Sequence, residues 1–198
     1  MTAQPAFTRA DPDERRQSLI EATARVLAQK GAAGVSVRAI CTEAGVSPGL
    51  LRHYFAGVSD AIAETYRWTG QQIDAALAQA VENAERTSRA ELVAYLTASF
   101  RPPIASGELL AGYVALWSLT LSDPAIAAVR GEVYSGYRIG LERLLHAYLP
   151  DKADMRLPAI ALTALIDGLW LELSLGNAPF TEAEARELVE LWLDGLLS

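Results

Sequence analysis

The side chains best suited to contacting a nucleic acid lie in residues 36–55. A short helix beginning at Ser47 would hold Ser47, Pro48, Gly49, Arg52 and His53 on its outward side. Ser, Arg and His side chains can donate hydrogen bonds to bases or phosphates. Pro48 and Gly49 add no donors but permit a close approach. This combination is typical of a surface that binds DNA.

Two short helices joined by a tight turn are predicted to position that surface. Ser36 can cap the first helix, and Gly45 follows its end, where a left-handed backbone is needed. Ser47 and Pro48 then begin the second helix as N-cap and first helical residue. This is helix-turn-helix geometry, in which the second helix enters the DNA major groove. The residues expected to pack between the helices are Ile40, Cys41, Ala44, Val46, Leu51 and Tyr54.

Other interpretations of these residues stay open. The hairpin can be part of a helical bundle, or a docking surface for another protein. Residues 45–49 match the G-x-S-x-G pattern of a nucleophilic serine, but that pattern needs a strand before Ser47. Only His53 and His146 are available as bases. No phosphate loop, dinucleotide-binding pattern or metal-ligand cluster occurs. We therefore predict no enzyme activity, no cofactor and no metal; a helical enzyme without a recognisable motif is the alternative.

The distribution of charge divides the chain into two parts. The 198 residues include 17 basic and 24 acidic side chains, a net charge of −7 that argues against a general polyanion binder. Residues 15–55 hold six basic and two acidic side chains, a net +4. Residues 61–198 hold ten basic and eighteen acidic side chains, a net −8. The average conceals a small basic module attached to a larger acidic one.

Composition limits the class of protein further. A hydrophobic content of 51% excludes disorder, and the single Cys41 excludes a disulfide scaffold. Residues 1–13 lack the apolar core of a signal peptide. The most apolar stretch, 157–175, is interrupted by Asp167 and Glu172, short of the ~18 uncharged residues of a membrane span. We predict a cytoplasmic protein without a membrane segment, with 157–175 as a helix buried on nearly all sides.

Apolar residues recur at three- and four-residue spacings, and no stretch shows the two-residue alternation of a strand. We predict an all-α fold of about nine helices: 12–30, 36–43, 47–54, 59–83, 88–100, 107–121, 124–148, 155–175 and 182–196. Capping signals occur at Asp11-Pro12, Ser88/Glu91, Asp123-Pro124 and Thr181/Glu184. The predicted organisation is a flexible tail at 1–11, a helix-turn-helix domain at 12–58 and a larger helical domain at 59–198.

Three short runs, 37–40, 44–47 and 53–55, resemble the DNA-binding head of the TetR family of bacterial repressors, over about residues 12–75. The resemblance implies a three-helix head and a long connecting helix, in a repressor that binds a palindromic operator as a dimer. The resemblance implies DNA contact by seven residues, and the position of Pro48 on the outward face adds an eighth. The expected DNA-binding residues are therefore Arg38, Ser47, Pro48, Gly49, Leu50, Arg52, His53 and Tyr54. The family usually has a Lys where this chain has Val58, which removes one phosphate contact that Arg52 can restore.

The C-terminal region resembles the choline-sensing BetI branch of that family, at Leu116-Trp117 and at 165–171. The resemblance implies a small-molecule effector, such as choline, that releases the DNA. The helices that form the family's pocket hold Tyr113, Trp117, Tyr134, Tyr137 and Trp170. Aromatic rings together with Asp167 can hold a quaternary ammonium. The alternatives are that the aromatic residues are ordinary core, and that Asp167 makes a capping bond, pairs with an arginine such as Arg138 or faces solvent.

The last two predicted helices, 155–175 and 182–196, are expected to form a homodimer interface. The apolar stripe of 182–196 is broad and includes Trp192. Gly168 lowers helix propensity by roughly 1 kcal/mol relative to Ala, which favours a role in close packing. A two-fold dimer would place two heads on successive major grooves.

Overall fold

The computed structural model describes residues 12–152 and 154–195, which form helices and connecting turns without a strand. The helices are α1 (Pro12–Lys30), α2 (Val37–Ala44), α3 (Pro48–Tyr54), α4 (Val58–Glu82), α5 (Ser88–Thr97), α6 (Gly107–Leu119), α7 (Pro124–Tyr148), α8 (Arg156–Leu175) and α9 (Glu182–Gly195), with 3₁₀ turns at Ala32–Gly34 and Ala98–Phe100. The all-α fold is confirmed, and most predicted boundaries agree within two residues. The expected tail at 1–11 and the Asp11 cap lie outside the described residues.

Capping contacts explain where several helices begin. Ser36 Oγ accepts a hydrogen bond from the Ala39 amide at 3.1 Å, as predicted. The Thr181 amide donates to the Glu184 carboxylate at 2.7 Å, one half of the expected capping box. One further predicted cap is confirmed in position, and one is wrong. Ser47 stands at the N-cap of α3 with Pro48 as the first helical residue, as predicted, although the Ser47 side chain makes no capping hydrogen bond. At α5 the cap is Thr87, because Ser88 is already helical.

The turn between α2 and α3 has the conformation that the sequence requires. Gly45 has φ 66° and ψ 32°, in the left-handed region that favours glycine. Its amide and that of Val46 donate to carbonyls of the last turn of α2. Only Val46 and Ser47 then separate Gly45 from the start of α3. The backbone therefore reverses within a few residues and fixes the two helices against each other.

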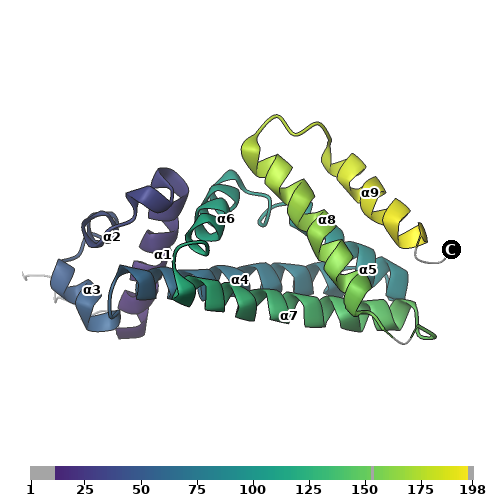
Figure 1. Ribbon diagram of the computed structural model, residues 1–198, viewed down its shortest axis with the longest axis horizontal. Coiled ribbons are helices and arrows are strands. Elements are labelled where there is room, and N and C mark those ends of the chain that lie inside the picture. Colours follow the sequence, from purple (N-terminus) through teal and green to yellow (C-terminus); the bar gives the residue numbers. More distant parts are fainter. Residues whose placement is uncertain (1–11, 153, 196–198) are drawn as a thin grey trace, which may run out of the picture.

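Helices α1, α2 and α3 gather at one end of the elongated molecule, and α4 runs from them into the rest of the chain (Figure 1). Helix α7 lies beside α4 and runs in the same direction, since Ser59 bonds to Asp123 near both N-termini and Arg67 bonds to Glu132 further along. Helix α6 packs against α1, and α8 crosses α6 and α7. Helix α4 is therefore the long element shared by both ends.

The buried apolar residues form two clusters. The smaller one joins α1, α2 and α3 to the start of α4 through Leu19, Ile20, Ala22, Ile40, Cys41, Leu51, Phe55 and Ala61. Ile40 and Leu51 are fully buried there, as the helix-turn-helix pattern predicts. Cys41 is also buried, and burial raises the pKa of its thiol. The larger cluster fills the space among α4 to α9. We call the first part the head and the second the sensor.

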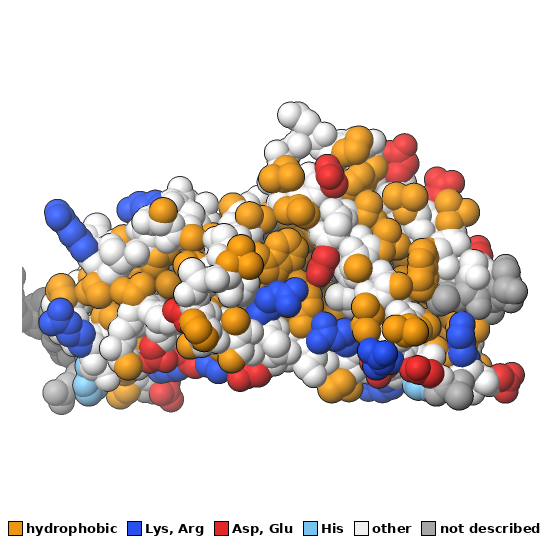
Figure 2. Space-filling view, viewed as in Figure 1, with side chains coloured by type: hydrophobic (Ala, Val, Ile, Leu, Met, Phe, Trp, Pro, Cys, Tyr) orange, Lys and Arg blue, Asp and Glu red, His pale blue; other side chains and the backbone are white. Residues whose placement is uncertain are grey.

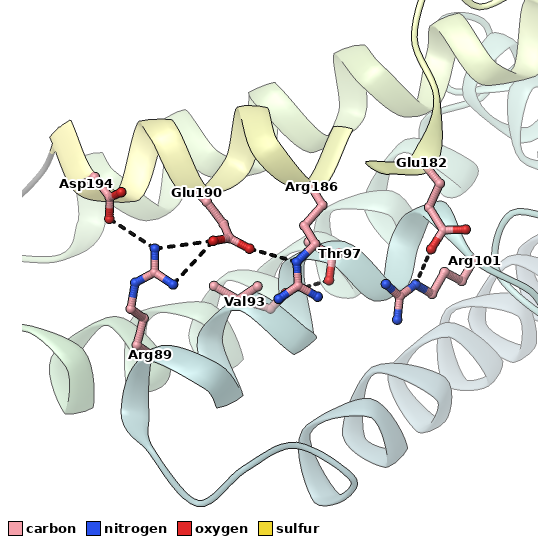
Figure 3. Close-up of polar contacts among 8 residues, drawn as sticks. All are labelled: Arg89, Val93, Thr97, Arg101, Glu182, Arg186, Glu190 and Asp194. Atoms are coloured by element: carbon pink, nitrogen blue, oxygen red, sulfur yellow. Dashed lines mark hydrogen bonds and ion pairs between the residues drawn. The ribbon is translucent and has the colours of Figure 1, made fainter. Parts of the chain in front are cut away.

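Helix α9 docks on α5 through apolar and charged contacts. Its buried stripe consists of Ala185, Val189 and Leu193. Beside that stripe, Arg89 bonds to Asp194 at 3.1 Å and lies 3.4 Å from Glu190, as Figure 3 shows. Arg186 bonds to Glu190 at 2.7 Å, and Arg101 to Glu182. These pairs are partly exposed, so burial of the apolar stripe provides most of the docking energy.

Helix α8 differs from its sequence-based description. Within 12–152 and 154–195 it is the one helix long and apolar enough, by length and composition, to cross a membrane, a test that core helices of soluble proteins also pass. It packs against α6, α7 and α9 with Ala159, Leu162, Ile166 and Trp170 buried. The prediction of burial on nearly all sides is wrong for this chain, because Leu157, Ile160, Leu171 and Leu175 are exposed.

Candidate DNA-reading surface and ligand cavity

The predicted DNA-binding residues gather on the outer side of α2 and α3. Arg38, Ser47, Pro48, Gly49, Arg52 and His53 are exposed, and Leu50 and Tyr54 are half-buried. Leu51 and Phe55 point the opposite way, into the head core. The ring of His53 meets that of Tyr54 edge-on, with centroids 4.9 Å apart. The structure thus brings together all eight residues, on a face held by buried neighbours.

Two of the basic residues counted in the head hold the fold instead of facing outward. Arg25 pairs with Glu43 of α2 at 2.7 Å, and Arg16 pairs with Glu64 of α4. By contrast, Arg38 and Arg52 have no ion-pair partner among the described residues. Figure 2 shows basic side chains projecting from the end of the molecule that α2 and α3 form. The charge available to a polyanion is therefore smaller than the sequence count of +4.

A cavity lies among α4, α6, α7 and α8. All six predicted ligand-binding residues line it: Tyr113, Trp117, Tyr134, Tyr137, Asp167 and Trp170. Its volume of about 60 Å³ suits a small ligand, since pockets for drug-sized compounds measure roughly 300–1,000 Å³. Tyr113, Trp117 and Trp170 meet edge to face, with centroids 5.1 to 6.0 Å apart. Several ring faces therefore surround one small volume.

Asp74 and Asp167 are the acidic residues that line this cavity, and Asp167 accepts a side-chain hydrogen bond. Tyr134 Oη donates to its carboxylate at 3.2 Å, and Trp117 Nε1 donates to Tyr134 Oη at 3.1 Å. Burial raises the pKa of Asp167 to about 6, while the Tyr134 bond and the charges of Arg130 and Arg138 oppose that rise. Its partner is thus a tyrosine, and neither an ion pair with Arg138 nor a capping bond forms. Above pH 6 the carboxylate is a half-buried negative charge beside aromatic rings.

Sequence reasoning missed Asp74 and Arg130, and it did not indicate that two of the predicted lining residues hold unpaired donors. The guanidinium of Arg130 lies 4.1 Å from the centroid of the Tyr134 ring. Trp170 Nε1 and Tyr137 Oη are buried donors without a hydrogen-bond partner among the described residues. Arg130 and Tyr134 are four residues apart on α7, a spacing that places them on one helix face. That spacing was the available signal for Arg130, whereas nothing local indicates an unpaired indole or phenol.

A second cavity of about 380 Å³ lies where α1, α4 and α6 meet. Its lining includes Glu21 and Arg25 of α1, Trp68 of α4 and Leu116 of α6. Tyr113 lines both cavities. One buried side chain on α6 therefore contributes to both the aromatic cavity and the junction between head and sensor.

A helix-turn-helix head, joined by one long helix to a helical domain with an internal cavity, defines a one-component transcriptional regulator. Residues 19–58 match bacterial regulatory proteins of the tetR family, and residues 88–198 match the C-terminal domain of BetI-type transcriptional repressors. The chain belongs to the TetR family, and it is a DNA-binding transcriptional regulator with a BetI-type C-terminal domain. A helix precedes Ser47, so the strand that a nucleophilic serine turn requires does not occur there.

Relatives of known name agree with this assignment. The chain is 33% identical to the HTH-type transcriptional regulator BetI 2 of Chromohalobacter salexigens, over 93% of this chain and 89% of that one. It is 29% identical to the regulator BetI of Burkholderia thailandensis, over 93% and 94%. A transcriptional regulator structure from Pseudomonas aeruginosa superposes with a TM-score of 0.87 at 37% identity, over 97% of this chain and 94% of that one. A Saccharomonospora viridis regulator, solved with choline, shares the fold at 18% identity and a TM-score of 0.79, over 92% and 96%.

Proposed function

We propose that the protein is a cytoplasmic repressor that binds a palindromic operator as a dimer and releases it when a small effector enters the aromatic cavity. Residues 12–58 form the DNA-binding unit and 59–198 the effector and dimerisation unit. One observation supports this proposal above the others: α4 and α6 both pack against α1 of the head, and both also line the cavity beside Asp167. The same two helices therefore connect the part that carries the exposed face of α3 with the cavity. The eight exposed or half-buried residues on the outer side of α2 and α3, named above, make the contacts with DNA.

The DNA proposal is tested with the DNA upstream of the regulated gene. Fluorescence anisotropy across a salt series is expected to show a specific complex that weakens steeply as salt rises, since phosphate contacts release counterions. Val58 supplies no charge at the start of α4, and Arg16 and Arg25 are already paired. Binding is therefore expected to need low to moderate salt and both heads. Absence of a specific complex at low salt, or binding indifferent to salt, would contradict the proposal.

The effector is a small molecule with an ammonium group, of which choline is the first probe. The Asp167 carboxylate and several ring faces line the cavity, and this combination attracts quaternary ammonium ions. A regulator of the same fold was solved with choline, which supports this choice of probe. Calorimetry should show heat with choline and none with 3,3-dimethylbutan-1-ol, a neutral compound of the same shape. Equal binding of both compounds would exclude charge recognition.

Dimerisation is assigned to the outer faces of α8 and α9. Exposed small and large apolar residues recur every three or four positions along α8, at 157, 160, 164, 168, 171 and 175. A Cβ added at Gly168 would meet nothing within 4 Å in this chain, so a second copy can approach closely there. Leu188 and Leu191 extend the apolar surface onto α9. Two matching surfaces of this kind suit a two-fold interface.

Sedimentation of Leu171→Arg tests the interface. The variant should be a monomer at concentrations where the wild type is a dimer, because the new charge would be buried without a partner. Leu121→Arg is the matched control, since Leu121 is 90% exposed in the turn after α6. It should stay dimeric. A dimeric Leu171→Arg variant would place the interface elsewhere.

Release of DNA requires that the effector favour one arrangement of the heads over another. Tyr113 is the proposed contact for this coupling, because it lines the cavity on one side and the α1–α4–α6 junction on the other. Effector contact with Tyr113 would shift α6 against α1. Tyr113→Phe should retain the coupling, whereas Tyr113→Ala should bind effector and DNA without mutual exclusion.

A further inference from the structure

Arg130 is a half-buried positive charge that no carboxylate of the described chain pairs with. Its guanidinium lies over the face of the Tyr134 ring, 4.1 Å from the ring centroid. The hydroxyl of the same tyrosine donates a hydrogen bond to the Asp167 carboxylate at 3.2 Å. The charge of Arg130 acts on Asp167 and lowers its pKa. A positive side chain therefore lies against a tyrosine of the cavity lining, and the lining itself contains the carboxylates of Asp74 and Asp167.

In Figure 2, a basic and an acidic side chain border a hydrophobic recess in the middle of this face of the molecule. Arg130 weakens the attraction of the aromatic cavity for a plain cation, because its positive charge repels a ligand that has only positive charge. The guanidinium keeps its N–H donors when it stacks on a ring, so it can still bind an anionic group.

Two further donors of the cavity lack an acceptor. Trp170 Nε1 and Tyr137 Oη are buried without a hydrogen-bond partner among the described residues. A buried donor left unpaired costs about 1–3 kcal/mol, so such groups are expected to meet an acceptor when the site is filled. A trimethylammonium group has no acceptor. A carboxylate has two oxygens and about four lone-pair positions.

We propose that the cavity selects a zwitterion, a small molecule with both an ammonium and a carboxylate group, and that Arg130 sets this preference. The ammonium group faces Asp167 and the rings, and the carboxylate faces Arg130 with Trp170 and Tyr137 as additional donors. The cavity volume of about 60 Å³ restricts the ligand to a short spacer between its charges. This inference rests on the proposed effector site and specifies its ligand.

Glycine betaine and choline are the matched probes, because they share the trimethylammonium group and differ in bearing a carboxylate or a hydroxyl. Calorimetry on the full-length protein should show glycine betaine binding at least tenfold more tightly than choline. Arg130→Gln should reverse the order: glycine betaine weakens at least tenfold, whereas choline binds equally or more tightly. Arg143→Gln, an exposed charge change on the same helix, should alter neither affinity.

The possible outcomes separate this inference from the proposed function. If the wild type prefers choline, or if Arg130→Gln weakens both ligands equally, the zwitterion inference is wrong and the ammonium site stands. If Arg138→Gln alone reverses the preference, Arg130 is not the determinant. If neither ligand binds the wild type, both proposals fail. Circular dichroism and operator binding of Arg130→Gln establish that the variant is folded.

Discussion

The head and the sensor solve different physical problems with the same helices. In the head, residues close together in the sequence make the defining contacts. The Ser36 hydroxyl caps α2 by accepting a hydrogen bond from the Ala39 amide, and the left-handed Gly45 forms the turn between α2 and α3. Its polar residues face outward and its core is closed. In the sensor, Tyr113, Tyr134 and Asp167 come from three helices and meet around a cavity. Among the described residues, two buried donors there have no acceptor, and the half-buried carboxylate of Asp167 accepts a side-chain hydrogen bond from a tyrosine.

The contrast shows where the structure retains capacity to bind. The head presents charge on a rigid surface, and DNA supplies the opposite charge from outside. The sensor holds polar groups that the fold leaves incompletely paired, and a ligand that pairs them stabilises the state it binds. Changes in the head should therefore alter DNA affinity alone. Changes in the cavity should alter ligand affinity and its dependence on pH.

Leu51→Ala should have the largest effect, and it breaks the head alone. Leu51 is fully buried between α2 and α3, so its truncation is expected to cost about 2–5 kcal/mol. Urea unfolding measures that loss, and anisotropy should show operator binding greatly weakened. Calorimetry should still detect effector binding by the sensor. Leu121→Ala, at an exposed position, is the control; equal loss of DNA and effector binding in Leu51→Ala would refute the independence of the two parts.

Arg52→Ala tests the outward face without disturbing the head core. Arg52 is exposed and has no ion-pair partner in the described chain. Removal of a base contact should cost about 1–3 kcal/mol for each head, and removal of a phosphate contact should reduce the salt slope by about one. Anisotropy at several salt concentrations distinguishes the two. Arg143→Ala matches the charge change on α7 and should leave operator binding unaltered.

Asp167→Asn sharpens the sensor side through pH. Since the pKa of Asp167 is about 6, effector affinity for an ammonium ligand should fall about tenfold between pH 7.5 and 5 in the wild type. The variant should bind weakly at both values, and calorimetry at the two pH values measures this. A wild-type affinity that does not change with pH would exclude Asp167 as the anionic partner.

Unfolding of the wild type and Asp167→Asn tests a pH dependence of the opposite sign, because the free energy of unfolding should fall as pH rises whereas ligand affinity should increase. A raised pKa in the folded state stabilises the protein at low pH, and this contribution declines from about pH 4 to about pH 6. Relative to Asp167→Asn, the wild type should therefore lose up to about 3 kcal/mol of stability over this range. Urea titrations at pH 4.5, 5.5 and 7 measure the difference. A difference that grows in favour of the wild type as pH rises would contradict the burial of Asp167.

Glu190→Gln should have the smallest effect. Glu190 pairs with Arg89 and Arg186 at partly exposed positions on α9 (Figure 3), where such pairs contribute about 0.2–1 kcal/mol. The loss in urea unfolding should shrink in high salt. Glu85→Gln, an exposed change outside these pairs, is the control. A loss of several kcal/mol would mean that charge, not the stripe of Ala185, Val189 and Leu193, holds α9.

Most of the head was predictable because its signals are local. The turn at Gly45 and the Ser36 cap depend on residues within one or two turns of helix. The error at Ser88 is equally local, since the preceding residue, Thr87, caps α5 in its place. The exposed stripe of α8 was not predictable, because apolar content alone does not distinguish contact within the chain from contact with a second copy.

The sequence by itself determined the all-helical fold, the helix boundaries and the composition of the outward face of α3, since these follow from periodicity, capping and turn chemistry. It also indicated the aromatic residues and Asp167, through resemblance to a family. Only the tertiary structure decided that Arg130 stands over Tyr134, that the donors of Trp170 and Tyr137 find no acceptor in the described part of the chain, and that Arg16 and Arg25 are paired. Those properties depend on which helices meet, and packing across the whole chain fixes that.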